Sequence, residues 1–229
     1  KEDLERMRLE YEDQGKLDLF YREMYNEIVD RSGSIFKREN FRYVSIESLI
    51  ERLKQGEFFR TFLTLDPAYV TTARHDYTCF VVAHTDAKMD LYVREVRRGR
   101  WDMPKIIKQW FELIKEYEPD GVGIQKIDWD KSLKMPVEDE MRRSGLHFRL
   151  TTLATYSQKK GMFNKEARIE RLSPKYSTGH VFHVEHGVGI SDLESELLAF
   201  PHGKNDDACF VAGTQVSTPF GERNIEEIQ

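Results

Sequence analysis

Three acidic residues of this sequence stand directly after apolar segments, and their type suits the binding of a divalent metal ion. Asp66 ends the apolar run "RTFLTLD", and the adjacent pair Asp206 and Asp207 follows an apolar helical segment in "FPHGKNDDA". Carboxylate oxygens are the ligands that Mg2+ prefers. Two such ions about 4 Å apart can clamp the attacking and leaving oxygens of a phosphodiester. Each stretch taken alone is more typical of an acidic turn or loop on the surface.

A third carboxylate is expected at the end of the strand "GVGI", which we predict to run parallel to the strand that ends at Asp66. The residue at that position is Gln125, whose amide offers one neutral oxygen and no charge. Asp128 and Asp130 follow closely and could replace it as ligands. They are equally suited to cap the helix predicted after them.

Basic residues recur at helical spacing in the segment "KKGMFNKEARIERLSPK". Those that fall on one predicted helical face are Lys165, Arg168, Arg171 and Lys175. They would form a phosphate-binding stripe, with Lys159 and Lys160 just before them in a DNA-contacting loop. The alternative is a solvated face on which neighbouring glutamates pair with them. A second basic stretch is "VREVRRGR", over residues 93–100.

The elements that must position these residues follow from hydrophobic periodicity. A strand over 60–66 precedes a hairpin over 76–99 whose turn lies near 86–89. Helices and strands then alternate, over the ranges 103–117 (helix), 120–127 (strand), 132–145 (helix), 147–154 (strand), 164–176 (helix), 179–185 (strand) and 191–201 (helix). Antiparallel strands followed by this alternation predict an α/β fold, with a mixed sheet covered by helices on both faces.

Composition narrows the class of protein. Of 229 residues, 39% are hydrophobic and 33% are charged, and no apolar run reaches 18 residues, which argues against a membrane span. The two cysteines, Cys79 and Cys209, give no disulfide framework and indicate a reducing compartment. The net charge of −5 argues weakly against nucleic-acid binding, but local patches decide that property. The sequence contains no P-loop motif, so it encodes no ATPase of that type.

Four segments together resemble the nuclease domain of bacteriophage terminase large subunits. They occur in the family's order, as "LTLDPAYVTTARHDYTCFVV", "GVGIQKIDWDKSL", "KEARIERLSPKYSTGHVFH" and "LAFPHGKNDDA". The resemblance covers residues 59–208 and implies a ribonuclease H-like fold. It also implies an endonuclease that cuts concatemeric double-stranded DNA with two Mg2+ or Mn2+ ions and little sequence preference. Residues 1–58 resemble the arm that links this domain to an ATPase domain.

The resemblance also implies roles for individual residues. Asp66 takes the place of the first metal ligand, and Asp206 and Asp207 take the place of the last. Gln125 stands where the family usually has a glutamate. Either Asp128 serves instead, or the site is natively weakened, or the residue was changed to disarm the enzyme. The implied partners are double-stranded DNA, the ATPase domain, the portal protein and the small terminase subunit. The implied location is the host cytoplasm at the viral prohead, with no membrane.

Two other functions are compatible with the same residues. One is a DNA-gripping or portal-docking module that has lost its chemistry at Gln125. The other is a different ribonuclease H-like enzyme, such as a junction resolvase, which would prefer branched DNA.

The last segment, residues 209–229, resembles the beginning of an intein. It starts with Cys209 and continues with "TQVST", a glycine turn and "IEEI". The resemblance implies a splice junction at Cys209, in a segment too short to splice, which we expect to be an irregular extension. An ordinary hairpin is the alternative.

Overall fold

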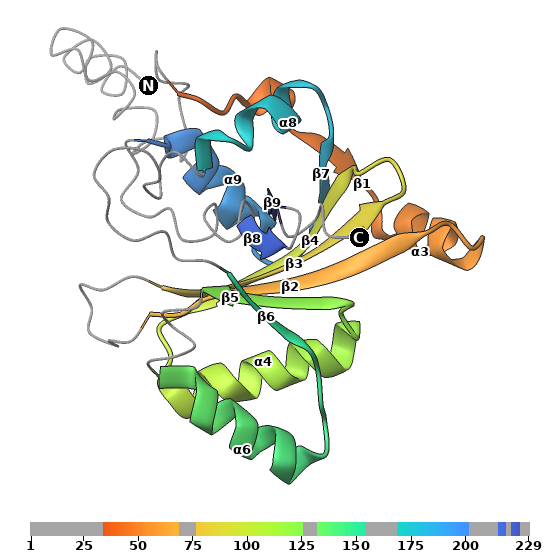
Figure 1. Cartoon of the computed structure of the whole chain (residues 1–229). Helices are drawn as coiled ribbons and strands as arrows, with labels where there is room; N and C mark the ends of the chain where they lie inside the picture. Colours follow the sequence, from red (N-terminus) through yellow and green to blue (C-terminus); the bar gives the residue numbers. More distant parts are fainter. Residues whose placement is uncertain are drawn as a thin grey trace, which may run out of the picture.

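The computed structural model describes residues 34–68, 77–125, 132–153, 169–201, 215–218 and 221–224. Most of these residues form one seven-stranded sheet with helices packed on its two faces (Figure 1). None of the described helices is long and apolar enough to span a membrane.

The centre of the sheet is an antiparallel meander of three strands. β2 (Phe59–Asp66) pairs with β3 (Thr78–Asp86), and β3 pairs with β4 (Leu91–Gly99). The predicted hairpin is therefore confirmed, with its turn directly after Asp86. That turn forms because the Asp86 carboxylate accepts hydrogen bonds from the backbone N–H groups of Lys88 and Asp90, at 2.9 and 3.1 Å.

Four further strands join the meander in parallel pairings. β5 (Gly121–Gln125) lies beside β2, and β6 (Leu150–Leu153) lies beside β5. On the other side, β7 (Val181–Val184) lies beside β4, and β1 (Arg42–Val44) lies beside β7. The strand order is β1-β7-β4-β3-β2-β5-β6, which confirms the predicted mixed sheet.

Helices cover both faces of the sheet, as predicted. α4 (Met103–Tyr117) and α6 (Lys134–Ser144) lie on one face, and α8 (Ser173–Ser177) and α9 (Ile190–Ala199) lie on the other (Figure 1). α4 begins where the Asp102 side chain accepts the backbone N–H of Lys105, and α6 stops at Gly145 in a left-handed conformation. α3 (Ile46–Lys54) lies beyond one end of the sheet, after the short 3-10 helix η1 (Arg38–Asn40).

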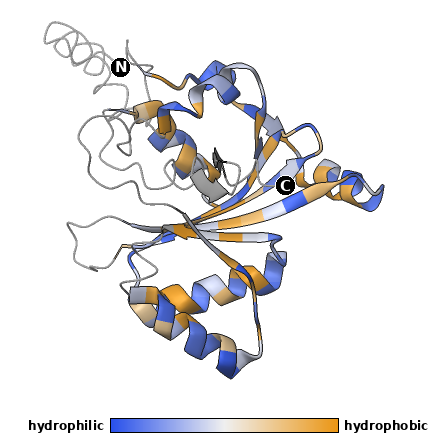
Figure 2. Cartoon of the chain, viewed as in Figure 1, coloured by the Kyte–Doolittle hydropathy of each residue, from blue (hydrophilic) through white to orange (hydrophobic). Residues whose placement is uncertain are grey.

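The two faces of β3 support two separate cores, which explains why all nine of its residues are buried. Cys79, Val81 and Ala83 pack with α9 and the residues around α8, whereas Phe80 and Val82 pack with α4 and α6. This alternation is the two-residue period of a strand. In Figure 2 apolar residues alternate with polar ones along α4, and its buried residues Ile106, Trp110 and Leu113 pack in the core on its side of the sheet.

The segment before residue 59 contributes to this fold. β1 extends the sheet, and Phe36, Phe41 and Leu49 are buried in its cores. The folded unit therefore begins before the predicted boundary at residue 58. This contribution was missed because a three-residue strand at a sheet edge leaves almost no periodic pattern. Where the linker from an ATPase domain would end stays a prediction.

Two other expectations need correction. The basic helix predicted over 164–176 is interrupted by a turn at Arg171–Leu172, and α8 starts only at Ser173. Pro174 explains the break, because it lacks a backbone N–H and its ring obstructs the preceding turn. The last segment contains an antiparallel pair, β8 (Gln215–Thr218) with β9 (Gly221–Asn224), and so is not wholly irregular. These strands form a small sheet of their own.

Candidate functional site

Asp66 is the last residue of β2 and is half-buried. Leu63 and Leu65 pack against α4 and α6. Because side chains alternate along a strand, Asp66 belongs to the opposite face, on the side of α8 and α9. The prediction that this aspartate ends a buried strand at the sheet edge is confirmed.

The register of the sheet places Gln125 beside Asp66. Leu65 is the partner of Ile124 in the parallel pairing of β2 with β5, so the next residues, Asp66 and Gln125, occupy corresponding positions at the two strand ends. Neighbouring strands lie about 4.8 Å apart. Position 125 is therefore the nearest strand position to Asp66 on the parallel side, as the sequence predicted.

The turn after Asp66 is fixed by the start of β3. Pro67 is buried, and the backbone N–H of Ala68 donates to the Thr78 hydroxyl at 2.9 Å. Thr78 is only 1% exposed. A buried hydroxyl holding the second residue after Asp66 restrains the backbone that carries the carboxylate, which a ligand or catalytic group requires.

On the antiparallel side of β2, the residues opposite Asp66 on the next two strands are Cys79 and Arg98. Asp66 is the partner of Cys79, and Cys79 is the partner of Arg98 in β4. Arg98 forms ion pairs with Glu196 and, at 3.0 Å, with Asp192, both on α9. Arg98 and Asp66 are two strands apart, about 10 Å. These ion pairs therefore anchor α9, the helix that precedes Asp206 and Asp207, to the edge where Asp66 lies.

Several predicted site residues lie outside the described residues. They are Asp128, Asp206, Asp207, Lys159, Lys160, Lys165, Arg168 and Cys209. For Gln125 the structure describes the backbone alone. Within the described ranges, no group of three or more His, Cys, Asp or Glu side chains could hold a metal ion. The described residues therefore bring together Asp66 and position 125, and the remaining ligands stay predictions.

Two residues of the predicted basic stripe are described. Arg171 is exposed and lies in the turn before α8, and Lys175 is half-buried within α8. Because the helix is interrupted between them, they do not share one continuous helical face. Their contact with DNA stays a prediction.

Three residues at this edge were not assigned from the sequence. Tyr77 lies directly before β3, and the guanidinium groups of Arg98 and Arg100 lie 5.0 and 4.2 Å from the centre of its ring. The basic stretch "VREVRRGR" was the sequence signal that could have pointed to these arginines. Only strand pairing shows which of them lie at this edge.

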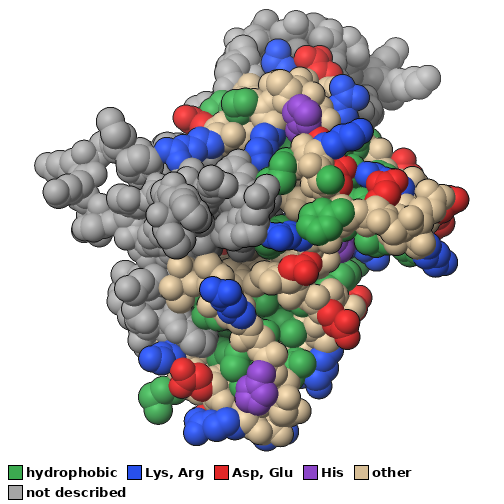
Figure 3. Space-filling model, turned by 45° about the vertical axis from the view of Figure 1, so that its right-hand side comes forward, with side chains coloured by type: hydrophobic (Ala, Val, Ile, Leu, Met, Phe, Trp, Pro, Cys, Tyr) green, Lys and Arg blue, Asp and Glu red, His purple; other side chains and the backbone are tan. Residues whose placement is uncertain are grey.

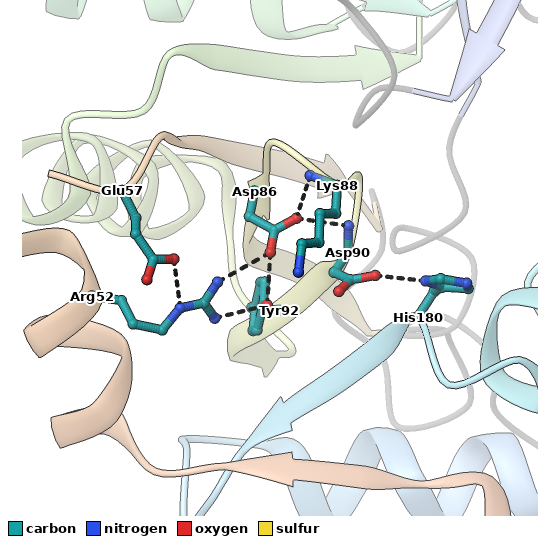
Figure 4. Close-up of polar contacts among 7 residues, drawn as sticks. All are labelled: Arg52, Glu57, Asp86, Lys88, Asp90, Tyr92 and His180. Carbon is teal, nitrogen blue, oxygen red and sulfur yellow. Dashed lines mark hydrogen bonds and ion pairs between the residues drawn. The ribbon is translucent and has the colours of Figure 1, made fainter. Parts of the chain in front are cut away.

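A buried polar cluster lies at the opposite end of the meander (Figure 4). Asp86 accepts hydrogen bonds from Tyr92 at 2.9 Å and from Arg52 of α3 at 3.1 Å. Burial opposes ionisation of Asp86, but hydrogen bonds from Tyr92, from the Asp90 and Lys88 backbone and from Arg52 outweigh it and lower its pKa. About 24 Å of strand separates this end from Asp66. The cluster therefore fixes α3 and the hairpin turn and takes no part in the site.

A second buried network joins β7, α8 and α9. The ring nitrogens of His183 contact Glu194 at 2.8 Å and the Tyr176 hydroxyl at 2.9 Å, and the His183 side chain is fully buried. With both nitrogens engaged inside the core, His183 ties these elements together.

On the face that Figure 3 presents, basic and acidic side chains are intermixed.

Comparison of the sequence with family models and with curated proteins finds no match. Solved structures do match. An inhibitor-bound, Mn-soaked structure of the human cytomegalovirus terminase nuclease domain gives a TM-score of 0.53 at 11% identity, covering 77% of this chain and 91% of that one. Another structure of that domain gives 0.52 at 12% identity, covering 80% and 92%.

The chain has a ribonuclease H-like fold. At these identities the likeness shows the fold alone, and it confirms the predicted fold class. Among the solved structures is also the nuclease domain of the large terminase subunit gp2 of bacterial virus Sf6, with a TM-score of 0.47 at 11% identity, covering 76% of this chain and 85% of that one.

Proposed function

We propose that this chain is the metal-dependent endonuclease domain of a viral DNA-packaging terminase. Its substrate is concatemeric double-stranded DNA, which it hydrolyses with little sequence preference. The observation that carries the proposal is that Asp66 and position 125 end two parallel strands whose register pairs the residues just before them. The ribonuclease H-like fold supports it, as do the four sequence segments that resemble terminase nuclease domains.

The donor types at this edge fit Mg2+ or Mn2+. Asp66 offers carboxylate oxygens and Gln125 has an amide oxygen, and both ions prefer oxygen ligands. Such ions lower the pKa of water and neutralise negative charge on a phosphate during hydrolysis. The chain's part is to hold them: Asp66 is restrained by the Thr78 hydroxyl through the Pro67–Ala68 turn.

Asp206 and Asp207 are proposed as the remaining ligands. α9 ends at Ala199, and its last turn is anchored through Glu196 to Arg98, about 10 Å from Asp66. The seven residues from Ala199 to Asp206 span up to about 25 Å when extended, so the chain length permits the approach. Asp128, three residues after Gln125, is the alternative source of a carboxylate.

Further parts of the proposal rest on the sequence alone. Residue spacing suggests phosphate contacts by the basic residues between 159 and 175. The resemblance implies a terminase assembly with an ATPase domain, portal protein and small subunit, a location at the prohead in the host cytoplasm, and an intein junction at Cys209. Because splicing needs a complete intein, we expect no self-cleavage at Cys209.

Cleavage of supercoiled plasmid tests the nuclease proposal. The chain, its Asp66→Asn variant and its Gln125→Glu variant are incubated side by side with Mn2+, Mg2+ or EDTA. We expect Mn2+-dependent nicking that Asp66→Asn abolishes and that Gln125→Glu raises, since the variant adds the missing charge. Cleavage that survives both EDTA and Asp66→Asn would refute the mechanism.

A DNA-gripping module is the second candidate, and the uncharged residue at position 125 favours it. Such a module binds duplex DNA without cutting it in Mn2+. If Gln125→Glu restores cutting to an inactive parent, the fold is a nuclease that has lost one ligand. A junction resolvase is distinguished by cutting branched DNA in preference to the plasmid.

A further inference from the structure

We infer that the exposed side of α3 is a self-complementary surface that binds a second copy of this chain, with the two α3 helices packed antiparallel. The residues of this surface, which we call the α3 face, are Glu47, Ile50, Leu53 and Lys54. The inference concerns association of the chain with itself, so it goes beyond the proposed nuclease activity and does not depend on it.

The position of α3 leaves one of its sides uncovered. The helix projects beyond the end of the sheet that is opposite to the candidate site (Figure 1). Its inner side is fixed by Leu49, which is buried, and by Arg52, which pairs with the Asp86 carboxylate at 3.1 Å (Figure 4). The residues of the α3 face are spaced three, four or seven positions apart, so they share one side of the helix, and all of them are exposed.

An apolar patch occupies the middle of the α3 face. Ile50 is 42% exposed, and Leu53, about one turn further along, is 43% exposed. Phe58, shortly after the helix, is 57% exposed, so three of the six exposed large apolar side chains in the described part of the chain lie within nine residues. A single exposed apolar side chain is common on soluble proteins, whereas a group of them is typical of an interaction surface.

Two opposite charges flank this patch. Glu47 lies in the first turn of α3 and Lys54 in the last, on either side of Ile50 along the helix. Neither side chain forms an ion pair or a hydrogen bond with another described residue. The other acidic side chains of the helix and of the turn after it are already engaged, by Gln55 at 3.3 Å and by Arg52 at 2.7 Å. The charges available for a partner are therefore one carboxylate and one ammonium, two turns apart.

This arrangement fits a second copy of the same helix in one orientation. The midpoint between residues 47 and 54 falls between residues 50 and 51. A two-fold axis at this point therefore places Glu47 of each copy opposite Lys54 of the other and brings the two Ile50 side chains together. Parallel packing would instead oppose like charges. Because the contact uses the same surface on both copies, it closes on itself and the expected product is a dimer.

The contact is small, so we expect weak association. A nine-residue helix is about 14 Å long, and its face is smaller than the roughly 800 Å² that each partner of a stable complex buries. We expect a dissociation constant on the order of 0.1 mM. About 24 Å of strand separates this end of the sheet from Asp66, so the dimer leaves the candidate site of both copies uncovered.

Sedimentation velocity of the chain tests this inference, in EDTA and without DNA, at concentrations from about 0.01 to about 0.5 mM. We expect the weight-average mass to rise from that of the monomer toward that of the dimer as the concentration increases. Added salt should weaken the association, because exposed ion pairs are screened. A mass that stays at the monomer value at every concentration overturns the inference and leaves the α3 face to a partner of another kind.

Charge reversal separates the α3 face from any other surface of self-association. Glu47→Lys and Lys54→Glu each place like charges opposite one another at two symmetry-related positions, and each should weaken dimerisation about 10-fold. The double variant, Glu47→Lys with Lys54→Glu, restores both pairs and should associate within about threefold of the parent. An equimolar mixture of the two single variants should form a heterodimer that is tighter than either homodimer. If the double variant is as weak as the single variants and the mixture gains nothing, the antiparallel pairing is wrong.

Ile50→Asp tests the apolar centre, because it brings two carboxylates together at the axis, and it should abolish measurable dimer. The matched control is Met135→Asp, which changes an exposed apolar side chain of α6 and should leave the association unchanged. Thermal denaturation of each variant checks that the fold is retained. If Ile50→Asp dimerises as Met135→Asp does, then α3 is not the interface.

The results also distinguish this inference from the nuclease proposal. A chain that dimerises through α3 but cuts no DNA with any metal keeps the inference and refutes the nuclease proposal. A chain that cuts DNA through Asp66 but stays monomeric does the reverse.

Discussion

Electrostatic coupling between positions 66 and 125 is the sharpest consequence of the sheet register. Gln125→Glu would place a second carboxylate at the strand position beside Asp66, where neighbouring strands lie about 5 Å apart. Two unit charges at that distance repel by about 1 kcal/mol in water and by about 3 kcal/mol at the effective dielectric constant of a protein surface. We therefore expect Gln125→Glu to lower the free energy of unfolding by about 1–3 kcal/mol in EDTA.

A double-mutant cycle isolates the repulsion energy between the carboxylates at positions 66 and 125. Urea unfolding of the parent, Asp66→Asn, Gln125→Glu and the double variant gives a coupling energy from which effects of each single change cancel. Because Asp66→Asn removes one of the two charges, the double variant should recover most of the stability that Gln125→Glu loses. Raising the salt concentration should shrink the coupling, because exposed charges are screened.

Binding of Mn2+ should turn the destabilisation caused by the carboxylates at positions 66 and 125 into a stabilisation. A cation held between two carboxylates turns their repulsion into a binding site, and a ligand at 100 times its Kd stabilises a folded protein by about 2.7 kcal/mol. We expect Mn2+ to raise the melting temperature of Gln125→Glu by more than that of the parent. If the coupling energy is near zero in EDTA and Mn2+ stabilises Gln125→Glu no more than the parent, then residues 66 and 125 do not belong to one site.

Two further predictions concern the stability of the scaffold. Burial lowers the pKa of His84 from 6.5 to about 4, with a smaller contribution from Arg94, so the folded protein keeps the ring neutral while the unfolded chain takes up a proton below pH 6.5. Between pH 7 and pH 5 the parent should therefore lose about 2 kcal/mol of unfolding free energy relative to His84→Gln, and urea titrations that show equal losses would contradict this account. Gly189 has a φ of +69°, and a Cβ there would overlap the Val96 carbonyl oxygen, so Gly189→Ala should cost more than about 2 kcal/mol. Gly56 has a φ of +80° but open space around it, so Gly56→Ala should lower the free energy of unfolding by only about 1 kcal/mol. Equal melting temperatures for the two variants would show that the contact of residue 189 with Val96 is unimportant.

Local pattern was enough to predict most elements. The helix over 103–117 has the bounds expected from its periodicity and its proline in the first turn. The hairpin turn after Asp86 followed from a polar stretch between two β-branched and aromatic runs. These signals are readable in sequence because they depend on neighbours within a few residues.

Other features could not be read in this way because they depend on partners distant in sequence. β1 is a strand only because β7, about 140 residues later, offers it an edge to pair with. The buried Glu194–His183–Tyr176 network likewise joins three elements whose meeting no local pattern specifies. Long-range pairing of this kind is decided by the tertiary fold.

The sequence by itself determined the residue types of the site: an aspartate at the end of a buried strand, an uncharged glutamine at the end of the next parallel strand, and an acidic pair after the last helix. Only the tertiary structure decided which side chains share an edge. Strand pairing aligned Asp66 with Cys79 and Arg98 on the antiparallel side, and it brought Tyr77 against Arg100. The physical reason is that register is set by hydrogen bonding and core packing across the whole sheet, so one residue of slip would turn each of these side chains to the opposite face.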